Sequence, residues 1–221
     1  MLEDPRPIPS GEGSIPSLEK RTVSEDVYLR VVEDAIRTAD ESGCAWVMIG
    51  GIASAVLGRA RWTLDIDFFV RPQDAKPLLE AFEQAGFATQ ETDPHWLFKA
   101  MRDEVHIDVI FQSAGGIYLD DEMLARAEIR EFNGNKVRIA PPEDLVIMKA
   151  LANKEASPRY WHDALSIIAK TDLDWDYLVE RARVGPRRIL SLLLYALSED
   201  LVVPEAPIRK LYDMVTQGGH G

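Results

Sequence analysis

Two aspartates separated by one residue lie in an otherwise apolar segment. Asp65 and Asp67 are part of the sequence LDIDFFV at residues 64–70, whose Ile, Phe and Val content predicts a β-strand. Residues two apart on a strand point to the same face, so the two carboxylates would project together. Two like charges this close repel each other and resist burial. A divalent cation would compensate both charges, so the pair predicts a metal site.

A third acid, Asp108, lies in a second predicted strand, VHIDVIF at residues 105–111. If the two strands are neighbours, Asp108 converges with Asp65 and Asp67. Mg²⁺ prefers carboxylate oxygens and leaves coordination positions for phosphate and water. Three carboxylates can hold two such ions roughly 3.5–4 Å apart, the spacing used in phosphoryl transfer. We therefore expect Asp65, Asp67 and Asp108 to bind Mg²⁺, as two ions, with Mn²⁺ as the alternative metal.

A glycine pair, Gly50-Gly51, lies just upstream, where a predicted strand should turn into a helix that contains Ser54. Glycines let backbone N–H groups approach a phosphate, and a helix N-terminus adds partial positive charge. A Gly-Gly pair alone is weak support, and an Asp-x-Asp pair alone often marks a solvated loop. Their occurrence together, in this order, is more specific and predicts a nucleotide-binding metal site.

These motifs resemble the nucleotidyltransferase superfamily of DNA polymerase β type. The resemblance rests on Gly50-Gly51, on RWTLDID at residues 61–67 and on His106-x-Asp108. Within the superfamily, the chain most resembles AbiEii-like and MenT-like proteins, the toxin half of type IV toxin–antitoxin pairs. The segments PEDLVIMK at 142–149 and RYWHD at 159–163 resemble later motifs of that subfamily. The match covers roughly residues 45–170.

The resemblance implies an α/β (α+β) fold with a mixed sheet flanked by helices and a C-terminal helical segment. Asp65 and Asp67 would bind both metal ions, and Asp108 would bind the second and help to activate an acceptor hydroxyl. Lys149 would neutralise phosphate charge, and Asp163 would orient Lys149 or a neighbouring residue. The residues implied to be catalytic are Asp65, Asp67, Asp108, Lys149 and Asp163. Those implied to bind the nucleotide are Gly50, Gly51, Ser54, Arg61, Thr63 and Lys149.

Several of these residues also have a simpler structural interpretation. Lys149 lies in an apolar stretch, where a lysine can bury its stem and extend its ammonium to water. Asp163 is equally consistent with an acid on a helix surface, and Arg61 with a surface charge. His106 is expected to be structural rather than a metal ligand. Three aromatic residues are expected in the core: Trp46, Trp96 and Tyr195.

The implied reaction transfers a nucleoside monophosphate from an NTP to a hydroxyl group. The acceptor would be RNA in a toxin-like enzyme, with an antitoxin protein as a further partner. The alternative acceptor is a small molecule such as an aminoglycoside. A different interpretation is that the chain is a nucleotide-binding module that has the same fold but does not catalyse a reaction.

Composition places limits on these functions. The chain has 221 residues and a net charge of -12, which argues against broad adhesion to nucleic acid, since phosphate neutralisation supplies most of that affinity. Residues 145–192 carry a small positive excess, so any polyanion contact should involve the C-terminal helices. No apolar run approaches the roughly 20 residues that span a bilayer, and we expect a cytoplasmic protein without membrane contact.

The order of predicted elements divides the chain into three parts. Residues 1–20 are rich in Pro and Gly and are expected to form a mobile tail. Residues 21–140 should form the nucleotidyltransferase core, and residues 141–221 a helical domain that begins at Pro142. In the core, helices are expected over 23–42, from 52, over 72–85 and over 118–127, and strands over 45–49, 64–70, 96–101, 105–111, 129–132 and 136–139.

Overall fold

The computed structural model describes residues 23–58, 63–154 and 158–217. The predicted tail at residues 1–20 and the proposed nucleotide contact of Arg61 lie outside the described residues.

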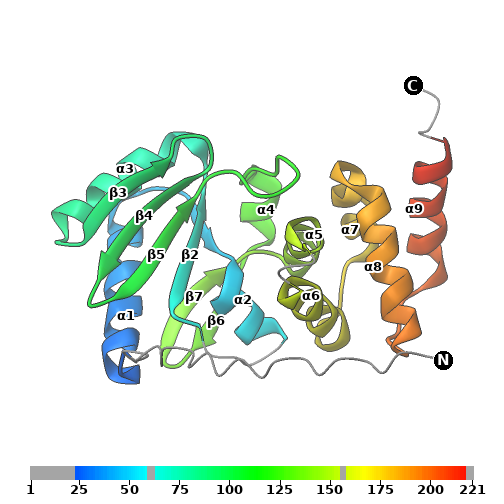
Figure 1. Cartoon of the computed structure of the whole chain (residues 1–221), viewed down its shortest axis with the longest axis horizontal. Helices are drawn as coiled ribbons and strands as arrows, with labels where there is room; N and C mark the ends of the chain where they lie inside the picture. The colour runs from blue at the N-terminus through cyan, green and yellow to red at the C-terminus, as the bar shows by residue number, and fades with distance from the viewer. Residues whose placement is uncertain (1–22, 59–62, 155–157, 218–221) are drawn as a thin grey trace, which may run out of the picture.

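In the described part of the chain, seven strands form one mixed sheet in the order β3-β4-β5-β2-β1-β7-β6 (Figure 1). Strand β2 pairs in parallel with β5, and β1 pairs in parallel with β7, while the other neighbouring pairs are antiparallel. The central position of β2 places its side chains beside those of β5 and the turn that follows β1. The strands are β1 Trp46–Met48, β2 Asp65–Val70, β3 Ala88–Asp93, β4 Leu97–Arg102, β5 Val105–Ile110, β6 Glu128–Phe132 and β7 Asn135–Ile139.

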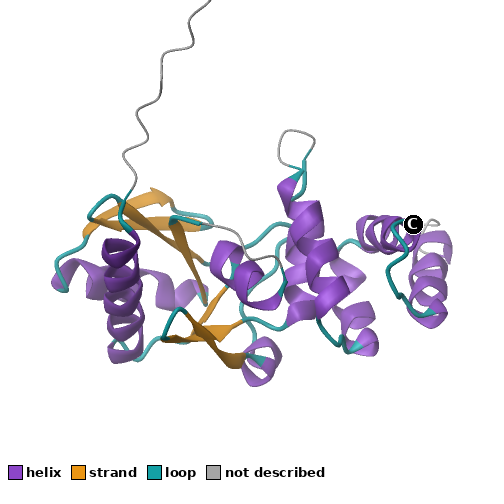
Figure 2. Cartoon of the chain, turned by 90° about the horizontal axis from the view of Figure 1, so that it is seen from below, coloured by secondary structure: helices purple, strands orange, loops and turns teal. Residues whose placement is uncertain are grey.

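Helices accompany this sheet and then continue beside it. Helices α1 and α3 contact each other and pack on the sheet, whereas α2 lies against β2 and reaches α6. The later helices stand beside the sheet rather than over it (Figure 2). The mixed α/β fold with a C-terminal helical segment is therefore confirmed. The helices are α1 Glu25–Glu41, α2 Gly50–Leu57, α3 Pro72–Gln84, α4 Asp121–Arg126, α5 Pro142–Ala152, α6 Arg159–Lys170, α7 Trp175–Arg181, the short 3-10 turn η1 Ala182–Val184, α8 Pro186–Ser198 and α9 Glu205–Gln217.

Local sequence signals account for most element ends. Ser24 accepts a hydrogen bond from the Val27 N–H and caps α1, and Pro72 begins α3, where its missing N–H costs nothing. The β6–β7 hairpin turns at Asn133 and Gly134, both with positive φ, as the Asn-Gly pair predicts. These elements were predicted because each signal acts within a few residues.

Helix α2 begins at Gly50, two residues earlier than expected, and two other elements differ more. Strand β3 was missed because its sequence, ATQETD, is polar and its side chains are largely exposed at the edge of the sheet. An edge strand with no buried face gives no apolar alternation to detect. Helix α4 begins at Asp121, later than expected, because the Asp120 side chain accepts from the Met123 N–H and acts as its cap.

Helix α5 connects the sheet to the helices that follow it. It packs against α6, α7 and α8. Its first turn carries the buried Asp144, which accepts hydrogen bonds from the Tyr177 hydroxyl at 2.6 Å and from Arg181 Nε at 2.7 Å. Arg181 also pairs with Asp120, the cap of α4. This polar network joins α4, α5 and α7, and buried polar groups of this kind are stable only when all their partners are present.

None of the helices within the described ranges combines the length and the apolar character needed to cross a membrane.

We predict that Arg181→Met lowers the free energy of unfolding by roughly 3 kcal/mol, because it leaves the Asp144 carboxylate buried without its cation. The side chains of Asp144 and Arg181 are 1% and 18% exposed. Urea denaturation measures this change. The matched control is Arg209→Met, which breaks an exposed pair with Glu205 and should cost less than about 1 kcal/mol. Equal losses in the two variants would contradict the assignment.

Candidate active site

The two acidic strands predicted from the sequence are direct neighbours. In the parallel pairing of β2 with β5, Asp67 lies opposite Asp108 and Asp65 lies opposite His106. Strand adjacency thus brings Asp108 to the aspartate pair, as the three-acid hypothesis required.

The two aspartates of β2 differ in burial. Ile66 and Phe68 are fully buried, and Asp67 between them is partly buried. Asp65 is the first residue of the strand and is exposed. The sequence argument assumed that both aspartates lie on a buried strand. Only Asp67 does so, because the strand enters the core after Asp65.

The glycine turn is built around the Asp67 side chain. The Gly51 N–H donates to Asp67 Oδ2 at 3.3 Å, and Gly50 has a φ of +64°. A Cβ atom on Gly50 would lie 1.9 Å from Asp67 Oδ2, and a Cβ atom on Gly51 would lie 2.3 Å from Thr63 Oγ1. Both positions need glycine because side chains of the β2 segment occupy the space beside the turn.

Burial and, after it, the nearby Asp108 carboxylate raise the pKa of Asp67 to about 6, while the Gly51 N–H and Lys149 act in the opposite direction. When Asp67 is ionised, its surroundings therefore lack the positive charge that would balance the carboxylate. Hard carboxylate oxygens on neighbouring strands are the donor set that Mg²⁺ or Mn²⁺ prefers, so the residues present fit a divalent cation.

The three carboxylates are nevertheless not gathered around one point. In the part of the chain that the structure describes, no group of three or more His, Cys, Asp or Glu side chains is arranged to hold a metal ion. Asp67 turns toward the Gly51 N–H, and Asp108 Oδ1 accepts from Lys99 Nζ at 2.6 Å. Metal binding by Asp65, Asp67 and Asp108 stays a prediction and would need side-chain rotation.

Lys149 and Asp163, predicted from the later motifs, lie together beneath the glycine turn. Both are buried, and Lys149 Nζ is 3.3 Å from Asp163 Oδ2 and 3.4 Å from the Gly50 carbonyl oxygen. Ser54 is also buried, and its hydroxyl donates to the same carbonyl at 2.6 Å. In this arrangement Lys149, Asp163 and Ser54 support the turn from inside, and their roles in catalysis or phosphate binding stay predictions.

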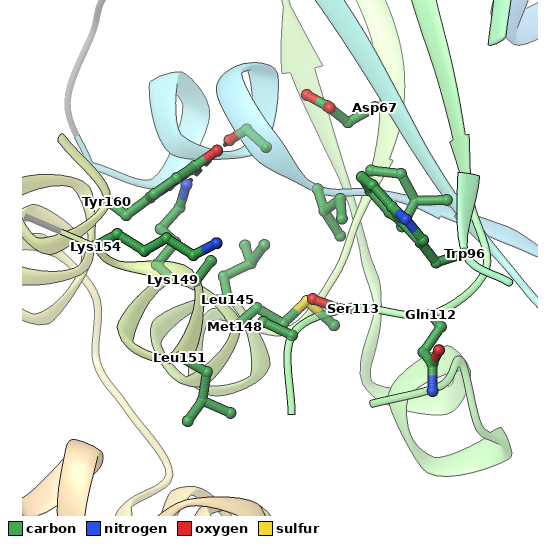
Figure 3. A pocket seen from close by; sticks show the side chains of 15 residues that line it. Asp67, Trp96, Gln112, Ser113, Leu145, Met148, Lys149, Leu151, Lys154 and Tyr160 are labelled. Atoms are coloured by element: carbon green, nitrogen blue, oxygen red, sulfur yellow. Dashed lines mark hydrogen bonds between the residues drawn. The ribbon is translucent and has the colours of Figure 1, made fainter. Parts of the chain in front are cut away.

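A pocket of about 450 Å³ opens between the sheet and the helices, with Asp67 on its wall. Asp67 faces Lys149, Lys154 and Tyr160 of the helical half across this space, and Trp96 lies on the sheet side (Figure 3). Apolar side chains form much of the remaining wall: Ile49, Ile110, Leu145, Met148 and Leu151.

Sequence reasoning missed part of this site. Trp96 was expected in the core, but it is 42% exposed and lines the pocket. Tyr195, also expected in the core, is 41% exposed, whereas Trp46 is buried as expected. Lys99 was not singled out, although a lysine between Phe98 and Ala100 in a strand is a charge on one face of an apolar segment and could have been noticed.

The chain belongs to a family of nucleotidyltransferases. Residues 28–186 match the family described as nucleotidyl transferase of unknown function (DUF2204). This match confirms the resemblance to the nucleotidyltransferase superfamily. Among curated proteins, none matches the chain.

Solved structures share this fold at low sequence identity. An antigenic nucleotidyltransferase-like protein from Paracoccidioides brasiliensis is 18% identical, with a TM-score of 0.52 over 80% of this chain and 90% of that chain. The antibiotic-resistance factor ANT(2'')-Ia is 16% identical, with a TM-score of 0.50 over 89% of this chain and 99% of that chain. At these identities the likeness establishes the fold alone.

We predict that Gly51→Ala destabilises the protein because the new methyl group overlaps the Thr63 side chain. The expected cost is about 1–3 kcal/mol, as for other overpacked sites. Thr63→Gly removes the atoms in conflict, so the double variant Gly51→Ala/Thr63→Gly should recover a large part of that loss beyond simple addition. A double-mutant cycle measured by thermal unfolding checks this. Strictly additive effects would contradict the close contact.

We also predict a pH-dependent effect of Asp67→Asn on stability. The pKa of Asp67 is raised from 3.8 to about 6 in the folded protein, so the folded state binds the proton more tightly. Stability from this group is present below about pH 4 and is lost as the pH rises through about 6. At pH 8, without divalent cations, Asp67→Asn should increase the free energy of unfolding by on the order of 2 kcal/mol.

Most of the advantage of Asp67→Asn should disappear at pH 4, where the Asp67 carboxyl of the folded protein is protonated. Thermal or urea unfolding at pH 4 and pH 8 measures it. The control is Asp172→Asn, at an exposed position away from the sheet, which should change stability equally at both pH values. A pH-independent effect of Asp67→Asn would show that burial does not penalise its charge.

Proposed function

We propose that this chain transfers a nucleoside monophosphate from an NTP to a hydroxyl group of an acceptor. The observation that carries the proposal is the placement of Asp67 opposite Asp108 on adjacent parallel strands, beside the Gly50-Gly51 turn and on the wall of a pocket. Membership in a nucleotidyltransferase family supports the same chemistry.

In the proposed reaction, the acceptor oxygen bonds to the α-phosphorus, the bond to the bridging oxygen breaks, and pyrophosphate leaves. The hydroxyl proton passes to a base, for which Asp108 is the candidate. Asp65, Asp67 and Asp108 would hold one or two Mg²⁺ or Mn²⁺ ions, which when bound neutralise phosphate charge and align the reacting oxygens. Lys149 holds the Gly50-Gly51 turn, which donates a hydrogen bond to the Asp67 carboxylate, from below.

The pocket favours a small acceptor with an apolar part. Its wall combines aliphatic side chains with Trp96 and Tyr160, and its charged residues are two lysines and one aspartate. A strongly cationic acceptor such as an aminoglycoside would meet two lysines, Lys149 and Lys154, and one aspartate, Asp67. Pockets that bind small molecules commonly combine an apolar lining with a few polar groups in this way.

RNA is the second candidate acceptor, and it would make the chain a toxin-like enzyme with an antitoxin partner. The sequence resemblance to AbiEii-like and MenT-like proteins supports it. A structural observation also favours it, since Arg187 and Arg188 are exposed in the first turn of α8. The residue before that helix, Gly185, lies next to Leu151, which lines the pocket, so phosphate could contact these arginines near the site.

We predict that Asp67→Ala lowers divalent-metal-dependent transfer by on the order of a hundredfold or more, because it removes the acid that two strands and the glycine turn converge on. Incubation of the protein with labelled NTPs, in parallel with total RNA and with a panel of small hydroxylated compounds, identifies the acceptor. Asp172→Ala, at an exposed position, is the control and should keep full activity.

Full transfer by Asp67→Ala would overturn the proposal. NTP binding that is unaffected by metal, with no turnover on any acceptor, would instead support a non-catalytic nucleotide-binding module. Calorimetry with and without Mg²⁺ separates these outcomes.

A further inference from the structure

A lysine completes a row of charged side chains across three neighbouring strands. In the antiparallel pairing of β4 with β5, Lys99 lies opposite Asp108, and Asp108 lies opposite Asp67 in the pairing with β2. Lys99 Nζ is 2.6 Å from Asp108 Oδ1. Its strand neighbours Phe98 and Ala100 are buried on the other face, so the strand itself directs the lysine toward the acidic row.

The ion pair is partly shielded from water. The side chains of Lys99 and Asp108 are 37% and 20% exposed, which places the pair between a surface contact and a buried one. Charges at this separation and degree of burial interact more strongly than they do in bulk water. Lys99 therefore fixes the orientation of Asp108 and neutralises it.

The other nearby lysine does not perform this task. Lys149 is buried, lies 3.3 Å from Asp163 and contacts the Gly50 carbonyl, so its charge is balanced by an acid outside the row. Asp65, Asp67 and Asp108 carry three negative charges when ionised, and Lys99 adds one positive charge. With Asp65 counted beside the row, these four side chains keep two negative charges, which one divalent cation balances.

We propose that Lys99 takes the place of a second metal ion at Asp108, so that the protein without nucleotide binds one divalent cation, at Asp65 and Asp67. A second cation must displace Lys99 from Asp108 or share the carboxylate with it. The triphosphate of an NTP supplies the additional negative charge that makes this exchange favourable. Lys99 is thus a positioning residue that couples occupancy of the second metal position to nucleotide binding. The inference rests on the proposed function, because the carboxylates are metal ligands only within it.

The test is titration of the nucleotide-free protein with Mn²⁺, followed by calorimetry and by the electron paramagnetic resonance signal of free Mn²⁺. The wild type is expected to bind one ion. Lys99→Met removes the ammonium and keeps an apolar stem, so a second ion should bind roughly ten- to a hundredfold more tightly than in the wild type. Lys99→Arg keeps the positive charge and should bind one ion, as the wild type does.

Lys76→Met is the matched control, because Lys76 is an exposed lysine that pairs with Glu91 at 3.6 Å, away from the row. It should leave Mn²⁺ binding unchanged. Equal Mn²⁺ stoichiometry and affinity in the wild type and Lys99→Met, or a second ion gained equally by Lys76→Met, would overturn the inference.

Asp67→Asn separates this failure from failure of the proposed function. Loss of Mn²⁺ binding in Asp67→Asn, together with no effect of Lys99→Met, would overturn the role of Lys99 and keep the metal site. The role of Lys99 and the proposed function would both be overturned if the wild type binds no Mn²⁺. They would also both be overturned if Asp67→Asn binds Mn²⁺ as the wild type does.

Discussion

The hydrogen bond from the Gly51 N–H to the Asp67 carboxylate is the contact on which the site depends. It joins the start of α2 to the centre of β2, and a side chain at position 50 would overlap the Asp67 carboxylate that accepts it. The same carboxylate lies opposite Asp108 across a parallel strand pair. One side chain therefore sets the path of the turn and the place where acidic groups meet, so the turn and the acids constrain each other.

The helical half contributes to this contact from below. Lys149, near the end of α5, reaches the Gly50 carbonyl and Asp163 of α6, and Ser54 donates to the same carbonyl. A lysine this deeply buried is stable only with partners, and these partners lie on two other helices, α2 and α6. The packing of α5 against α6, and of α6 against α2, therefore supports the glycine turn from the helical half of the chain.

The sequence predicts what depends on near neighbours and misses what depends on tertiary pairing. The central strands, the Asn133-Gly134 hairpin and the fold class follow from local periodicity and turn chemistry, and the structure confirms them. The convergence of Asp108 with Asp67 could be stated only as a condition, because no local pattern specifies which strands are neighbours. Lys99 could have been noticed between Phe98 and Ala100, but its contact with Asp108 depends on the register of β4 against β5. Trp96 was assigned to the core from its type, whereas its place next to the pocket depends on where β4 begins.

The distribution of charge across the pocket limits how a nucleotide could lie in it. Carboxylates come from β2 and β5 on the sheet side, while Lys149 and Lys154 come from the helical side. A triphosphate would be attracted by the lysines and repelled by the carboxylates unless a cation lies between them. The site thus has an electrostatic reason to bind nucleotide and metal together, because each neutralises charge that opposes the other. On the sheet side, Lys99 reduces the need for a cation, because its ammonium already neutralises Asp108 before any ligand binds.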